Sequence, residues 1–143
     1  MAKSGVFSKV IVKRMAISLF LGVLFGLLCA YLASSGAGEN YWGGAIMWNI
    51  IFNRILIGFV VAILGLITIH PLFGFRMYPF LRGAVAGAII SIDISFGAFI
   101  MQMQNASSIA IMTIIAGAIY GMIIDIVATK CAGEGEEAFK SIK

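Results

Sequence analysis

The stretch MAISLFLGVLFGLLCAYLAS, residues 15–34, carries no charged side chain. It is roughly 20 residues long, which is the length that an α-helix needs to cross a bilayer core of about 30 Å. Lipid solvates such a helix directly, whereas a water-soluble domain of this size would have to cover it on every side. The stretch therefore predicts a first membrane span.

Three further apolar stretches follow at short intervals, at residues 44–69, 83–103 and 109–129. Of the 143 residues, 62% are hydrophobic and only 11% are charged, so little of the chain is left outside the spans. Because the connections are short, neighbouring spans must run antiparallel. We therefore expect an all-α fold, an integral membrane four-helix bundle forming one domain over residues 1–143, with a polar C-terminal tail at 130–143.

Lysine and arginine are biased to one side of this predicted bundle. If the N-terminus is cytoplasmic, the extracytoplasmic turns contain no basic residue, and Arg54 lies inside the second span. Since cytoplasmic segments are enriched in Lys and Arg, we predict a protein of the cytoplasmic (inner) membrane with both termini in the cytoplasm. The net charge of +4 then reflects topology and not nucleic-acid binding. The basic residues on the predicted cytoplasmic side are Lys3, Lys9, Lys13, Arg14, Arg76, Arg82, Lys130, Lys140 and Lys143.

Two polar segments are expected on the cytoplasmic side. The connection at residues 70–82 holds both prolines of the chain and should interrupt the helix between the second and third spans. The acidic run at residues 133–137 is expected to be solvated and mobile, with docking to a partner as the alternative.

Small residues recur at every fourth position in all four spans. Helices in lipid gain nothing from hydrophobic burial against each other, so close contact depends on small side chains that let backbones approach. The stripes therefore predict a tightly packed bundle. They consist of Ser18, Gly22, Gly26, Ala30 and Ser34 in the first span, Gly58 and Ala62 in the second, Gly83, Gly87, Ser91 and Ser95 in the third, and Thr113, Gly117, Gly121 and Asp125 in the fourth.

The run NRILIGF at residues 53–59, together with Leu81-Arg82-Gly83 and with Gly87 and Ser91, resembles a pattern in small multi-span bacterial membrane proteins of unassigned function. The resemblance covers about residues 48–96. It implies a compact multi-span membrane protein and transfers no site residue.

Arg54 and Asp93 are charged residues inside predicted spans. If the helices are straight, both lie about 15 Å from the extracytoplasmic boundary. A lone charge at that depth costs from about 3 to more than 10 kcal/mol. Pairing across neighbouring helices lowers that cost, and a guanidinium can bind a carboxylate through two parallel hydrogen bonds. We therefore predict a buried ion pair between Arg54 and Asp93.

This predicted pair has two interpretations. In the structural one it fixes the register of two helices, and in the functional one it is a gate, a proton-coupled carboxylate or an anion site in a water-filled pathway. A protonated Asp93, hydrogen-bonded within the bundle, is a third alternative, because burial disfavours a charge.

Three further candidate site residues, Asp125, Asn49 and Asn53, lie in predicted spans. Asp125 is near the cytoplasmic end of the fourth span, within reach of Arg14, Arg76 or Arg82, and an interfacial salt bridge is expected there. Asn49 and Asn53 share the outer part of the second span with Arg54. They either line a polar vestibule or belong to a solvated helix end.

The remaining residues form no catalytic or metal-binding motif. His70 is the single histidine and has no cysteine or carboxylate at ligand spacing, and no serine lies in a G-x-S-x-G turn. We therefore expect no enzymatic activity, no metal and no cofactor. The expected function is that of a structural or interaction subunit, which packs in the lipid bilayer against copies of itself or another membrane protein. The alternative is a small oligomeric transporter or channel that uses Arg54 and Asp93.

Overall fold

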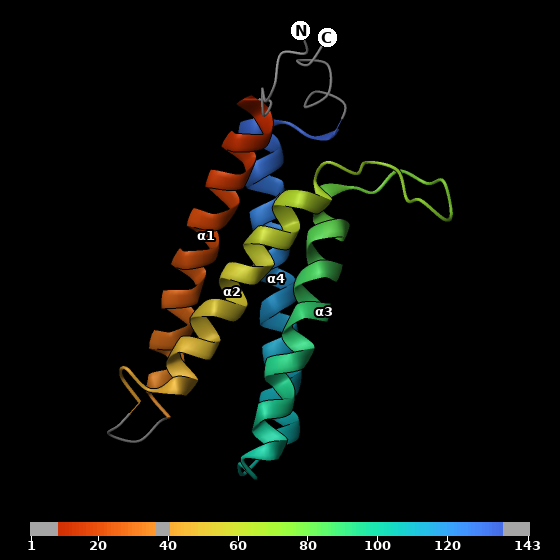
Figure 1. Ribbon diagram of the computed structural model, residues 1–143. Coiled ribbons are helices and arrows are strands. Elements are labelled where there is room, and N and C mark those ends of the chain that lie inside the picture. The colour runs from red at the N-terminus through yellow and green to blue at the C-terminus, as the bar shows by residue number, and fades with distance from the viewer. Residues whose placement is uncertain (1–8, 37–40, 136–143) are drawn as a thin grey trace, which may run out of the picture.

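A computed structural model of the protein describes residues 9–36 and 41–135. These residues form four α-helices, each long and apolar enough to cross a membrane, packed as a bundle. The basic residues Lys3, Lys140 and Lys143 lie outside the described residues. The all-α four-helix prediction is confirmed. The helices are α1 (Lys9–Ser34), α2 (Ala45–Leu64), α3 (Pro79–Ile100) and α4 (Ala106–Ala132) (Figure 1).

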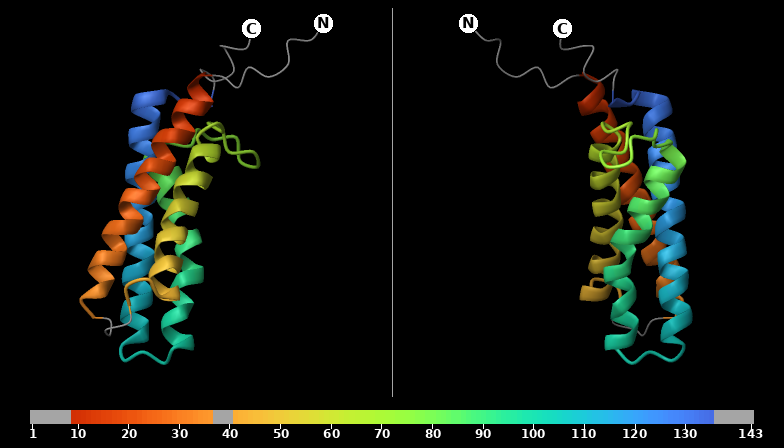
Figure 2. Two further views of the ribbon diagram at one scale, coloured as in Figure 1. Left: turned by 60° about the vertical axis from the view of Figure 1, so that its left-hand side comes forward. Right: turned by 90° about the vertical axis from the view of Figure 1, so that its right-hand side faces the viewer.

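The helices form two antiparallel hairpins, α1 with α2 and α3 with α4, that pack against each other (Figure 2). Helix α4 contacts all three others, whereas the backbones of α1 and α3 lie diagonally and stay apart over their described lengths. Helix α1 begins and α4 ends at the same end of the bundle, called here the terminal end (Figure 1). The opposite end, where α1 is joined to α2 and α3 to α4, is called the far end.

Helix α2 ends at Leu64, earlier than the predicted limit of residue 69. Its C-cap is Gly65, and a Cβ atom there would collide with the guanidinium of Arg14. The last carbonyl groups of a helix have no partner within that helix. The early end of α2 therefore leaves carbonyl oxygens available to side chains, and arginines from α1 and α3 use them as described below.

The connection between α2 and α3 leaves the side of the bundle at the terminal end (Figure 1). It doubles back through an antiparallel bridge between Ile69 and Arg76, and Leu72 and Phe73 lie exposed at its tip. Helix α3 begins at Pro79, four positions before the predicted start. Proline is well tolerated at the first helical position, because the N–H group that it lacks would have no partner within the helix there. Pro71 thus lies between α2 and α3, and Pro79 is the first residue of α3, so the helix is interrupted between the two as predicted.

The predicted small-residue stripes form the helix contacts. Between α3 and α4, a Cβ atom on Gly87 would collide with the carbonyl oxygen of Gly117. Between α1 and α2, a Cβ atom on Gly26 would lie 3.1 Å from the Cα atom of Ile51. Each hairpin is therefore held by backbone-to-backbone contact that any larger side chain would prevent. Between the two hairpins, the core is filled by Ile57, Val61, Ala86 and Ile124.

Candidate functional site

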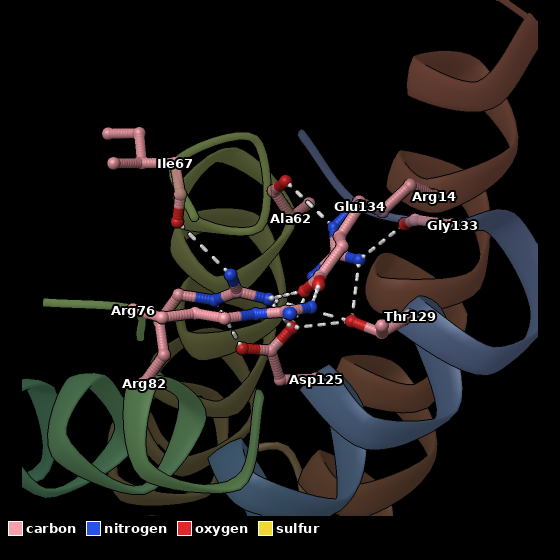
Figure 3. Close-up of polar contacts among 9 residues, drawn as sticks. All are labelled: Arg14, Ala62, Ile67, Arg76, Arg82, Asp125, Thr129, Gly133 and Glu134. Atoms are coloured by element: carbon pink, nitrogen blue, oxygen red, sulfur yellow. Dashed lines mark hydrogen bonds and ion pairs between the residues drawn. The ribbon is translucent and has the colours of Figure 1, made fainter. Parts of the chain in front are cut away.

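Asp125 lies at the centre of a buried ionic cluster near the terminal end (Figure 3). It is fully buried and forms salt bridges with Arg14 of α1 and Arg82 of α3. The Nε of Arg82 donates to one carboxylate oxygen at 2.7 Å, and its Nη2 donates to the other at 2.9 Å. This two-pronged contact is the geometry in which a guanidinium binds a carboxylate most strongly. Arg14, Arg82 and Asp125 are called here the arginine clamp.

The clamp ties together all four helices. Arg14 donates through Nε to the carbonyl oxygen of Ala62 in α2 at 3.2 Å and through Nη1 to Thr129 Oγ1 in α4 at 3.0 Å. Arg82 donates to the carbonyl oxygen of Ile67, just beyond α2, at 3.1 Å. Both carbonyl groups belong to the region where α2 ends early. The clamp thus uses backbone acceptors that a longer α2 would have kept for itself.

Glu134, in the tail that was predicted to be solvated and mobile, also belongs to this region. Its carboxylate accepts a hydrogen bond from Arg76 at 3.0 Å and lies 3.6 Å from Arg82. The neighbouring Gly135 donates its N–H to the carbonyl oxygen of Gly65 at 3.0 Å. The described part of the tail is therefore packed against the bundle, and the expectation of a solvated segment is wrong for residues 133–135. Residues 136 and 137 lie outside the described residues.

The expected salt bridge of Asp125 is confirmed, and it is fully buried among the helices. Of the three candidate arginines, Arg14 and Arg82 bind Asp125, whereas Arg76 binds Glu134. Three arginines, Arg14, Arg76 and Arg82, share the two carboxylates Asp125 and Glu134, so each of these charged groups has an oppositely charged partner. Because Arg14, Arg82 and Asp125 bind one another, we interpret the clamp as a structural element that holds the helices together.

Arg54 is a further buried cation, placed toward the middle of α2. It is 1% exposed, and its Nη1 donates to Ser91 Oγ at 2.7 Å and to Asn53 Oδ1 at 3.0 Å. Its Nη2 donates to Cys29 Sγ at 3.7 Å, and the guanidinium carbon lies 5.3 Å from the ring centre of Tyr120. All four helices thus contribute to its surroundings, and every one of these neighbours is formally neutral.

The predicted ion pair between Arg54 and Asp93 is wrong. Arg54 is hydrogen-bonded to Ser91, which is fully buried, whereas Asp93 is exposed. Each helical residue turns the chain by about 100°, so Asp93 points roughly 200° away from Ser91 around α3. The prediction compared the positions of Arg54 and Asp93 along their helices, but it did not take into account the side of α3 on which Asp93 lies. A buried Arg–Asp pair is present in the protein, and it is formed by the clamp.

Asp93 interrupts an apolar stripe on the outer surface of α3. It follows Val85 and Ile89 at intervals of four residues, and these side chains are 49% and 61% exposed. Ile92 and Phe96 flank it and are also exposed. At 1.5 Å per residue, Asp93 lies about 10 Å from the end of α3 at Ile100. Among the described residues it has no ion-pair or hydrogen-bond partner.

The two asparagines of α2 have different settings. Asn53 is buried and donates through Nδ2 to the carbonyl oxygen of Ile90 in α3 at 3.1 Å, in addition to accepting from Arg54. Asn49, one turn nearer the far end, is exposed. Asn53 therefore supports Arg54 and joins the two hairpins, whereas Asn49 lies on the exposed side of α2.

Two neighbours of Arg54, Cys29 and Tyr120, are uncharged and were not predicted from the sequence. Cys29 contacts Arg54 within the hairpin of α1 and α2, whereas Tyr120 comes from α4 of the other hairpin. In the described part of the chain, no group of His, Cys, Asp or Glu side chains is arranged to hold a metal ion. No family model, curated protein or solved structure matches this chain, so the functional argument depends on the geometry alone.

Proposed function

We propose that the protein is a non-catalytic interaction subunit of the cytoplasmic membrane, with its terminal end in the cytoplasm. In this proposal the Asp93 face of α3 binds a membrane span of another protein, and that span carries a basic side chain at the depth of Asp93. The observation that carries the proposal is the position of a carboxylate in the middle of an exposed apolar stripe.

Asp93 differs in its surroundings from the other charged residues within the spans. Arg14, Arg54, Arg82 and Asp125 are all buried inside the bundle, whereas Asp93 faces outward. A charged side chain facing lipid at this depth costs about 3 kcal/mol or more. The short aspartate side chain cannot reach the headgroup region from about 10 Å below the helix end, as a lysine would. A donor on a neighbouring span removes that cost most directly.

A second copy of this chain does not fit as the partner. The exposed basic side chains on the described helices are Lys9, Lys13 and Lys130, which all lie near the terminal end. A copy inserted with the same topology therefore presents these lysines roughly 20 Å from the level of Asp93. A different membrane protein with an arginine or lysine in its span supplies the complementary charge.

A defined probe tests this proposal without knowledge of the natural partner. The labelled full-length protein is reconstituted in lipid vesicles with a synthetic leucine–alanine membrane helix that carries one arginine about 10 Å below its outer end. Fluorescence energy transfer between the labelled protein and the helix measures binding. The control is the same helix with leucine in place of arginine. We expect the arginine helix to bind at least about tenfold more tightly, because the ion pair forms in a low-dielectric setting.

Asp93→Asn should abolish this preference, whereas the matched control Glu134→Gln, which neutralises a carboxylate at the terminal end, should retain it. Equal binding of the two helices to the wild-type protein, or a preference that survives in Asp93→Asn, would contradict the proposal. Self-association that depends on Asp93 and needs no added helix would also overturn it in favour of a second copy.

A further inference from the structure

Arg54 carries a charge that the described part of the chain does not balance. The described carboxylates are Asp93, Asp125 and Glu134. Asp125 and Glu134 are bound by other arginines at the terminal end, and Asp93 faces outward from α3. Arginine does not lose its proton in proteins, so Arg54 cannot remove the imbalance by becoming neutral. An unbalanced charge at this depth is strongly unfavourable, and a counter-anion would offset it.

The hydrogen bonds of Arg54 identify the part of the guanidinium that is available for such an anion. Its Nη1 is engaged by Ser91 and Asn53. The opposite edge consists of Nε and Nη2. Nε is buried without a hydrogen-bond partner, and Nη2 has only the thiol sulfur of Cys29, which is a weak acceptor. This edge is the two-donor fork with which arginine binds oxyanions, as Arg82 does with Asp125.

We propose that the Nε and Nη2 edge of Arg54 binds a small monovalent anion, of the chloride or planar oxyanion type, in the middle of the bundle. Cys29 of α1 lies beside this edge and Tyr120 of α4 lies over the guanidinium. A monovalent anion neutralises the charge of Arg54, whereas a divalent one would leave a buried negative charge in its place. Asp93 takes no part in this site, so the proposal is independent of the proposed interaction face.

Cys29 permits a test in which the chain supplies the anion itself. In Cys29→Asp, a carboxylate replaces the thiol next to Nη2 and should occupy the fork permanently. The matched control is Cys131→Asp, the same substitution at an exposed cysteine near the terminal end. Arg54→Met removes the fork and is the third variant. Chloride, nitrate and formate are each titrated against the purified full-length proteins, with gluconate keeping the ionic strength constant.

We expect saturable binding of at least one of these anions to the wild-type protein, measured by a rise in the thermal unfolding temperature and by direct radiolabelled-chloride binding or its displacement. Cys131→Asp should behave like the wild type. Binding should be weakened at least about tenfold in Arg54→Met and in Cys29→Asp, because each loses the charge-assisted contact with the added anion. Cys29→Asp should also unfold at a temperature that no longer depends on the anion.

The relative affinities for chloride, nitrate and formate distinguish a halide site from an oxyanion site. Two results would overturn the inference. One is the absence of saturable binding of all three anions to the wild-type protein. The other is binding that persists undiminished in Cys29→Asp, since the anion would then lie elsewhere. Because Cys29→Asp retains Arg54 and its other contacts, the test does not depend on Arg54→Met being able to fold.

Discussion

Replacing Asp125 by leucine removes the carboxylate that Arg14 and Arg82 share. Both arginine side chains are at most 2% exposed, so neither can turn to solvent once the carboxylate is gone. The variant Asp125→Leu therefore leaves two neighbouring guanidinium groups in a low-dielectric setting. Glu134 compensates in part, because it lies 3.6 Å from Arg82.

The magnitude follows from these contacts. Removing one partner of a buried ion pair destabilises proteins by about 3–5 kcal/mol, mainly because the other charge is left unpaired. Asp125 serves two arginines and also accepts from Thr129 at 3.3 Å, so the upper part of that range is expected. Replacing all three clamp residues together, with Met for both arginines and Leu for Asp125, should recover part of the loss, since no charge is then stranded.

The assay is reversible unfolding in mixed detergent micelles, followed by circular dichroism. Asp93→Leu is the matched control, because it makes the same substitution at an exposed position on a helix; it removes a charge that faces outward and should not destabilise the bundle. If Asp125→Leu unfolds at the same detergent composition as Asp93→Leu, the clamp contributes nothing to stability. If the triple variant is less stable than Asp125→Leu alone, the loss does not come from stranded charge.

Three further predictions follow from helix packing, the tail and topology. Gly87→Ala should destabilise the bundle by at least about 1–3 kcal/mol, because its Cβ collides with backbone, whereas Gly97→Ala on the same helix has open space and should stabilise it by up to about 1 kcal/mol. Unfolding in detergent measures both changes, and equal effects of the two substitutions would show that Gly87 is not at a close helix contact. Glu134→Gln should lower the free energy of unfolding by less than about 2 kcal/mol in the same assay, since the Glu134 side chain is 18% exposed and its partner Arg76 is largely solvated. A loss of stability as large as that of Asp125→Leu would mean that Glu134 is as important to the ionic cluster as Asp125. A membrane-impermeant thiol reagent should label Ser107→Cys in intact cells but Met77→Cys only after permeabilisation, and the reverse pattern would overturn the proposed orientation.

The sequence was sufficient to predict the helices and the surfaces by which they pack. Apolar length predicts a span whatever its neighbours are, and Gly22 or Gly117 at four-residue spacing marks a contact face on its own helix. These are local signals, so they survive without knowledge of the tertiary structure. The early end of α2 was not predicted, because Gly65 lies in an apolar run and its contact with Arg14 is visible only in the tertiary structure.

The pairing of charges was predicted less well, because it depends on helix rotation as well as depth. Arg54 and Asp93 have opposite charges at similar depths, but Ser91, two residues earlier in α3, occupies the face toward α2. The stripe of Gly83, Gly87, Ser91 and Ser95 already marks the packed face of α3, and Asp93 does not belong to it. That stripe was the available signal for excluding the pair. Nothing comparable in the sequence indicated that Cys29 and Tyr120 meet Arg54.

The clamp also has a consequence for biosynthesis. Arg14 enters the membrane with the first helix, yet Asp125 is 111 residues later in the chain, so the ribosome completes the first hairpin long before the matching carboxylate exists. Until the last helix is inserted, Arg14 must remain near the water interface or be shielded by the insertion machinery. A protein truncated before Asp125 retains Arg14 and Arg82 without the carboxylate that binds both of them, so the two hairpins lose the ion pair between Arg14 and Asp125 that joins them.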